Sequence, residues 1–91
     1  MKYRPTKEAK EMLCKLLDRC MEITDNTTAD VFFHYSPHTG CYTVIVHPDG
    51  WGVNDEGIWL TDITEITVEN IIETTAKLEK ICEELEGNEN V

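Results

Sequence analysis

Apolar residues recur at spacings of three and four at both ends of the chain and alternate with polar residues in its middle. The first pattern is typical of a helix with one buried face, and the second of a strand with one buried side. The helical pattern covers about residues 6–23 and 68–86 of the 91-residue chain, and the alternating segments are 29–36, 41–47 and 58–63. The sequence therefore predicts an α+β fold in the order α-β-β-β-α: a three-stranded antiparallel meander, with two amphipathic helices packed on one face.

Capping residues predict where the two helices begin and end. Thr6 is the expected N-cap of the first helix, and the polar stretch 24–28 ends it. Thr67 is the expected cap of the second helix, and Gly87 follows its end. The stripes expected to face the sheet are Ala9, Met12, Leu13, Leu16, Leu17, Cys20 and Met21 in the first helix, and Val68, Ile71, Ile72, Thr75, Leu78, Cys82 and Leu85 in the second.

The length of the chain suits one hydrophobic core and is too short for two. We therefore expect a single domain over residues 1–87, followed by a frayed tail at 88–91. No apolar run approaches the roughly 20 residues that a membrane span needs. The first five residues lead into a charged segment without the apolar core of a signal peptide, so we expect a cytoplasmic protein.

The four cysteines are expected to be reduced. Cys14 and Cys20 are six residues apart on the first helix, or about 9 Å along its axis, which is beyond the reach of a disulfide. Cys82 occupies an apolar position of the second helix, where a free thiol acts as a small hydrophobic group. In a cytoplasmic protein the interpretation is buried free thiols.

Aromatic residues are expected on both faces of the sheet. Strict alternation places Phe32 and Trp59 opposite to the side chains that face the core. Exposed apolar side chains on the second face would be covered by a dimer or by a partner protein.

The charges are segregated along the sequence. Residues 1–19 carry six basic and three acidic side chains, whereas residues 20–76 carry ten acidic side chains and no Lys or Arg. Residues 77–91 carry two basic and five acidic side chains, and the net charge of the chain is −10. The acidity therefore belongs to the sheet, the turns and the second helix.

Two interpretations of this acidity are open. Charged runs often form no more than a solvated surface. The alternative is a ligand for a basic protein surface, because a negative patch steers association with a positive one. Trp51 would then be an interface anchor, although it could also fold back onto the core. Eight residues are expected to form this partner-binding patch, and a meander is expected to make them contiguous. They are Asp49, Trp51, Asp55, Glu56, Asp62, Glu65, Glu69 and Glu73.

No catalytic, metal or cofactor site is expected. His34, His38 and Cys41 flank the first hairpin, but their spacing matches no common zinc pattern and a fourth ligand is missing. Cys41 and His38 also lack a third group to orient a Cys–His pair for nucleophilic catalysis. The glycines and carboxylates of residues 47–57 do not have the alternating spacing of a calcium loop, and a Pro-Asp-Gly turn explains their composition.

The order of elements is similar to that of the double-stranded RNA-binding domain. That family has a basic cluster at the start of its second helix, where it grips phosphates. The corresponding residues 68–73 of this chain, Val-Glu-Asn-Ile-Ile-Glu, contain no Lys or Arg. Carboxylates at these positions repel a nucleic-acid backbone, so the resemblance implies the topology and no direct nucleic-acid binding.

In size, acidity and element order the chain also resembles some small anti-CRISPR proteins of phages, which act as acidic mimics of nucleic acid. This resemblance implies an inhibitor of a nucleic-acid-binding protein and assigns no site residues. Our leading hypothesis is thus a non-enzymatic binding protein that presents a carboxylate patch to a basic protein surface. The alternative is a structural or assembly module that homodimerises through its sheet face or its helices.

Overall fold

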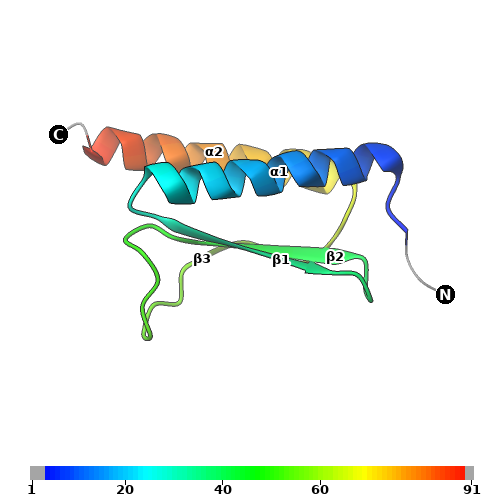
Figure 1. Ribbon diagram of the computed structural model, residues 1–91, viewed down its shortest axis with the longest axis horizontal. Helices are drawn as coiled ribbons and strands as arrows, with labels where there is room; N and C mark the ends of the chain where they lie inside the picture. Colours follow the sequence, from blue (N-terminus) through cyan, green and yellow to red (C-terminus); the bar gives the residue numbers. More distant parts are fainter. Residues whose placement is uncertain (1–3, 90–91) are drawn as a thin grey trace.

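The computed structural model describes the backbone of residues 4–89 and the side chains of residues 4–85. Two helices and three strands follow one another in the expected order (Figure 1). They are α1 (Lys7–Asn26), β1 (Asp30–Ser36), β2 (Cys41–His47), β3 (Ile58–Glu65) and α2 (Val68–Glu89).

The three strands form one antiparallel sheet in the order β1-β2-β3. Both helices lie side by side on the same face of this sheet, α1 against β1 and α2 against β3 (Figure 1). The predicted α+β meander with two helices on one face is confirmed. Within the described residues, no helix combines the length and the apolar character needed to cross a membrane.

Hydroxyl caps begin both helices. The Oγ1 of Thr6 accepts from the N–H of Ala9 at 3.1 Å, and the Oγ1 of Thr67 accepts from the N–H of Asn70 at the same distance. These caps satisfy backbone donors that have no partner inside the helix. The expectations for Thr6 and Thr67 are confirmed.

Both helices are longer than the sequence predicts. α1 continues through Asn26, because the side chains of Asn26 and Thr27 donate to the carbonyls of the preceding turn and so satisfy its end. α2 continues through Gly87 to Glu89, so Gly87 does not end it and residues 88–89 are helical. Residues 90–91 of the expected frayed tail lie outside the described residues.

The predicted apolar stripes are correct at their centres and wrong at their margins. Leu17 and Met21 of α1 are exposed, because they lie on the side of the helix that points past the free edge of β1 and away from α2. In α2 it is Thr74 that is buried, whereas Ile72 is exposed. The two helices contribute these residues to the core: Ala9, Leu13, Leu16, Cys20 and Ile23 from α1, and Ile71, Leu78, Cys82 and Leu85 from α2.

The central strand supplies the most deeply buried part of the sheet. Tyr42, Val44 and Val46 alternate along β2 and are fully buried beneath the helices. The hydroxyls of Tyr42 and Thr74 share a hydrogen bond of 2.7 Å, so neither polar group is left unsatisfied in the core. This bond connects β2 to α2 at one defined rotation of the helix.

β3 departs from regular pairing near its middle. Its register with β2 shifts on both sides of Val44, and two consecutive residues, Leu60 and Thr61, are buried. The Thr61 hydroxyl accepts from the N–H of Val44 at 2.9 Å and donates to the carbonyl of Tyr42 at 3.3 Å. A side chain thus provides the ladder bonds that the bulged backbone cannot make, and Ile63 takes a positive φ of 48°.

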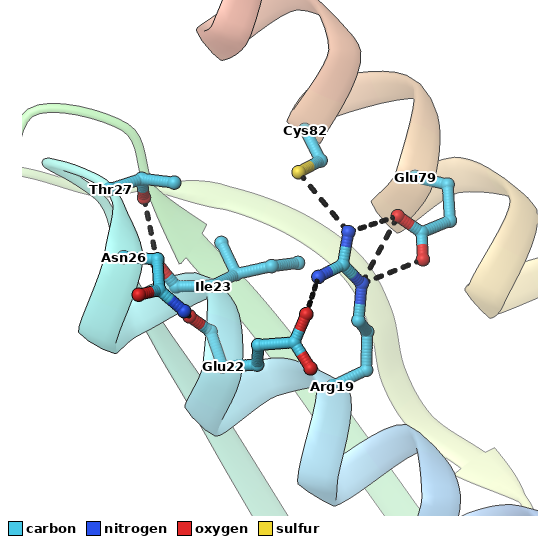
Figure 2. Close-up of polar contacts among 7 residues, drawn as sticks. All are labelled: Arg19, Glu22, Ile23, Asn26, Thr27, Glu79 and Cys82. Atoms are coloured by element: carbon cyan, nitrogen blue, oxygen red, sulfur yellow. Dashed lines mark hydrogen bonds and ion pairs between the residues drawn. The ribbon is translucent and has the colours of Figure 1, made fainter.

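Arg19 joins the two helices (Figure 2). Its Nε and Nη2 donate to the Glu79 carboxylate of α2 at 2.8 Å, its Nη1 donates to Glu22 of α1, and its Nη2 also contacts the Cys82 sulfur at 3.4 Å. The pairing holds the pKa of Glu79 below its usual value and raises that of Arg19. A two-pronged contact fixes the orientation of the helices more tightly than a single ion pair does.

The cysteines are free, as expected, but only two of them are buried. Cys20 and Cys82 belong to the core, Cys41 is half-buried, and Cys14 is exposed. The expectation that the thiols are buried is therefore wrong for Cys14, which lies on the same side of α1 as Leu17 and Met21. Burial raises the pKa of Cys20 to about 11.

Glu79→Gln should lower the free energy of unfolding by about 1 kcal/mol, because the variant keeps the size of the side chain and loses its charge opposite Arg19. Denaturant unfolding followed by far-ultraviolet circular dichroism measures the change. Glu83→Gln removes a charge from an exposed side chain of the same helix. Equal effects of the two substitutions would show that the contact with Arg19 contributes nothing.

Candidate functional site: the outer face of the sheet

An apolar row crosses the face of the sheet that the helices leave uncovered. The strand register sets Phe32 opposite Ile45 and Ile45 opposite Trp59, so these three side chains lie side by side across β1, β2 and β3. Phe32 is 45% exposed and Trp59 54% exposed, and Ile45 between them is half-buried. The expectation of exposed aromatics on the second face is confirmed for Phe32 and Trp59.

The segment 48–57 between β2 and β3 projects away from the helices (Figure 1). Its residues Trp51, Asp55 and Glu56 line a hollow together with this row. Hydrogen bonds tie its start to the neighbouring chain: Thr28 Oγ1 donates to the Pro48 carbonyl at 3.0 Å, and the N–H of Trp51 donates to the Asp30 carboxylate at 2.7 Å. Its end is held by Trp59, whose indole N–H donates to the Glu56 carbonyl at 3.1 Å. The loop therefore has a defined position beside the sheet.

A histidine and an aspartate fasten the loop to β2. The Nδ1 atom of His47 lies 2.7 Å from Oδ2 of Asp55, and Oδ1 of Asp55 accepts from the N–H of Gly57 at 3.1 Å. A carboxylate only accepts hydrogen bonds, so Nδ1 carries the proton in this contact. The bond from His47 is the main reason that the pKa of Asp55 lies below its usual value, and the Gly57 bond acts in the same direction. His47 is only 4% exposed, and its ring lies 5.1 Å from that of Phe32.

Gly57 makes this arrangement possible. Its φ of +71° belongs to the left-handed region, and a Cβ at this position would lie 2.7 Å from Cε1 of His47 and 2.8 Å from Cγ2 of Ile45. Any other residue would push against the buried histidine from a strained backbone. The loop can therefore approach β2 closely only with glycine here.

Two open hollows adjoin the apolar row. The larger has a volume of about 450 Å³ and lies between the row and the loop, where Trp51, Asp55 and Glu56 line it together with His47. The other, of about 390 Å³, extends from the row over His34 and Thr43 to Asp62. Both combine an aromatic floor with carboxylates at the margin.

The structure separates the eight residues predicted for the partner-binding patch into two groups. Asp49, Trp51, Asp55 and Glu56 belong to the loop at the start of β3, and Asp62 lies on the outer face of the same strand. Glu65 is the last residue of β3, opposite Cys41, and α2 carries the other two, Glu69 and Glu73. Glu65 lies six residues, about 20 Å, beyond Trp59 along β3, and α2 places Glu69 and Glu73 in the helical layer, on the other side of the sheet. The expectation of one contiguous patch is therefore wrong, because Glu69 and Glu73 belong to the helical layer whereas the loop lies beside the outer face.

Two of these carboxylates already have partners in the fold. Asp55 holds His47, and Glu73 pairs with Lys77 at 3.3 Å. Asp49, Glu56 and Asp62 are exposed and form no ion pair with another described residue. The carboxylates available at the outer face are thus those of Asp49, Glu56 and Asp62.

The site includes residues that the predicted set leaves out. Phe32, Ile45 and Trp59 form its floor, and His47 supports the loop. Alternation along the strands points to the outer face for each of them, but only the cross-strand register shows that they form a row. The burial of His47 had no sequence signal, since it depends on the path of the loop.

The histidines and cysteines do not gather at a metal centre. His34 and Cys41 line a small hollow on the outer face with Thr43 and Ile63. Within the described part of the chain, no three His, Cys, Asp or Glu side chains are close enough together to hold a metal ion. The residues that line the larger hollow include the His47–Asp55 pair but no Ser, Cys or Lys that it could activate. This pair therefore serves to anchor the loop.

No family model matches this sequence, and neither the curated proteins nor the solved structures yield a match.

Gly57→Ala should lower the free energy of unfolding by about 1–3 kcal/mol, because the added methyl combines backbone strain with a clash against His47. Gly52→Ala is the matched control on the same loop, since nothing lies within 4 Å of the position of its Cβ. Chemical unfolding of both variants measures the difference. Similar stabilities would contradict the close packing of Gly57 on His47.

The contribution of Asp55 to stability should depend on pH. Since the pKa of Asp55 is lower in the folded protein than in the unfolded chain, its stabilising effect is present above the unfolded pKa of about 3.9 and is lost as the pH falls through the lower, folded pKa. Asp55→Asn should therefore be less stable than the wild type at pH 7, and the difference should shrink on acidification. Asp49→Asn, an exposed change on the same loop, should show no such convergence.

Proposed function

We propose that this protein is a non-enzymatic binding domain whose outer sheet face docks on a basic surface of a partner protein. The observation that carries this proposal is the exposed row of Phe32, Ile45 and Trp59, bordered by a loop that presents Trp51 and carboxylates. Large exposed aromatics bordered by polar groups are typical of protein interfaces, where Trp is enriched among the residues that dominate affinity.

The charge of the surface supports a basic partner. All three strands and both connecting loops lie in residues 20–76, which contain no Lys or Arg. Asp49, Glu56 and Asp62 are therefore uncompensated by any cation of the sheet or its loops. A partner that supplied Lys or Arg to the margin and an apolar group to the centre would match both parts of the surface.

The same charge argues against two other occupants. Nucleic acid would be repelled, because its phosphates would face carboxylates, and Glu69 stands at the start of α2 where RNA-binding domains of similar topology have basic residues. A second copy docked face to face would set Asp49, Glu56 and Asp62 against their own equivalents. Like charges at an interface oppose association.

The narrower form of the proposal is an inhibitor that mimics nucleic acid, as the resemblance to phage anti-CRISPR proteins implies. Its support is the acidic surface, which would compete with phosphates for a positive groove. This narrower form can be tested separately. It requires that the partner binds nucleic acid, and that nucleic acid and this protein compete for the same site on the partner. A partner bound equally well in the presence of nucleic acid would leave the docking proposal in place and remove the mimicry.

Neutralising the outer carboxylates together, as Asp49→Asn/Glu56→Gln/Asp62→Asn, should weaken binding roughly tenfold and flatten its dependence on salt. Phe32→Ser should abolish binding at every salt concentration by removing part of the apolar row. The measurements start with affinity capture from the native host and continue as titrations of the purified captured protein at several ionic strengths.

The matched control neutralises the three predicted carboxylates that do not lie beside the apolar row, as Glu65→Gln/Glu69→Gln/Glu73→Gln. It makes the same change in net charge and should alter affinity by less than about twofold. Loss of binding in the control with retention in the outer-face variant would move the site to α2 and overturn the proposal.

A further inference from the structure

The edge of the sheet formed by β1 has free backbone groups. The even-numbered residues of β1 face β2, since the Ser36 carbonyl accepts from Gly40 within the hairpin and Val31, an odd-numbered residue, donates its N–H to Thr24 of α1 at 3.0 Å. Backbone groups alternate in direction along a strand. The N–H and C=O groups of Phe33 and Tyr35 therefore point away from the sheet.

The two edges of the sheet differ in their protection. β3 is bulged, contains a residue of positive φ and uses threonine hydroxyls in its ladder, features that make an edge a poor template for another strand. β1 pairs with β2 in unbroken register over all seven of its residues and contains no Lys or Pro. Of the two edges, β1 is the one suited to pairing.

An exposed apolar stripe of α1 lies beside this edge. Cys14, Leu17 and Met21 recur at helical spacing on the side of α1 that faces away from α2. Leu17 and Cys14 share an apolar groove of about 280 Å³ with Phe33 and Tyr35 of β1. The groove thus combines an unpaired strand with an uncovered helix face.

We propose that a second copy of this chain occupies the groove, with β1 pairing antiparallel to β1 about a twofold axis at His34. The N–H and C=O groups of Phe33 in each copy would bond to those of Tyr35 in the other, and the N–H of Val31 would keep its bond to Thr24. The product is a continuous six-stranded sheet with all helices on one face.

The charges of α1 favour this arrangement. Because Leu17 and Cys14 lie beside Phe33 and Tyr35, a twofold axis at His34 also centres an antiparallel pairing of the two α1 helices near Leu17. Cys14 of one copy then lies opposite Met21 of the other, and Lys10 lies opposite Asp25. Lys10 and Asp25 form no ion pair with another described residue of their own chain, and they are about 22 Å apart along α1.

The dimer sets one distance between the paired strands and another between the paired helices. Strands pair about 4.8 Å apart, whereas packed helices lie 8–10 Å apart. β1 would then lie about 2.4 Å from the twofold axis and each α1 axis about 4–5 Å from it, so the pairing requires α1 to lie slightly inward of β1, toward β2. The apolar row of the outer face lies on the other side of the sheet and stays free. The dimer is therefore independent of the proposed docking function.

Sedimentation equilibrium over a range of protein concentrations tests the proposal. The wild type is expected to dimerise, with a mass twice the 10.5 kDa of the chain. Lys10→Asp alone, or Asp25→Lys alone, should raise the dimer dissociation constant about tenfold, because each change falls on two symmetry-related contacts. The combined Lys10→Asp/Asp25→Lys variant should restore association, which no contact within a single chain could do.

Lys15→Asp is the matched control, since it makes the same charge change on another side of α1 and should leave the dissociation constant unchanged. Met21→Cys should form a cross-linked dimer on mild oxidation through Cys14 of the second copy, and Cys14→Ser should prevent it. A wild type that stays monomeric at every concentration would overturn the proposal, as would a dimer whose dissociation constant is unmoved by the charge substitutions.

Discussion

Two helices cover one face of a three-stranded sheet, and the other face is covered only in part, by a loop. The rest of this structure depends on that constraint. The inner face is closed by Tyr42, Val44 and Val46 beneath α1 and α2. On the outer face the 48–57 loop covers His47 and packs against Ile45, while Phe32 and Trp59 at the two ends of the apolar row remain exposed to solvent. The surface that we interpret as functional is the part of the sheet that neither the helices nor the loop covers.

The distribution of charge follows the same division between layers. Arg19 is the last basic side chain before Lys77, and it is used between the helices, where Glu22 and Glu79 neutralise it. The sheet and its loops, which have no cation of their own, keep their carboxylates exposed. The unpaired carboxylates of the sheet layer would therefore be available to the basic partner that we propose, whereas Arg19 joins the two helices.

Much of the fold could be predicted from the sequence, because it depends on local patterns. The bounds of β2, the caps at Thr6 and Thr67 and the side of the sheet on which Phe32 lies all follow from alternation and from hydroxyl placement. The bulge in β3 could not be predicted, since Leu60 and Thr61 break the alternation and are compensated only by contacts with β2. The helical period shows that Leu17 and Leu13 share a face, but it does not show where the sheet beneath them ends. For the candidate site, the sequence located the loop and its carboxylates, whereas the grouping of the eight residues depended on which layer of the fold carries each of them.

The chain has two tryptophans, and both stand on the outer face. Trp51 is carried by the loop, and Trp59 forms one end of the apolar row with its indole bonded to the loop backbone. Their emission therefore reports on one surface and not on the core. Docking of a ligand on this surface would therefore change the tryptophan fluorescence, and no added label would be needed to detect it. On heating, a change in tryptophan fluorescence would record release of the loop. If this transition and the loss of helical circular dichroism had different midpoints, the difference would not by itself reveal a folding intermediate.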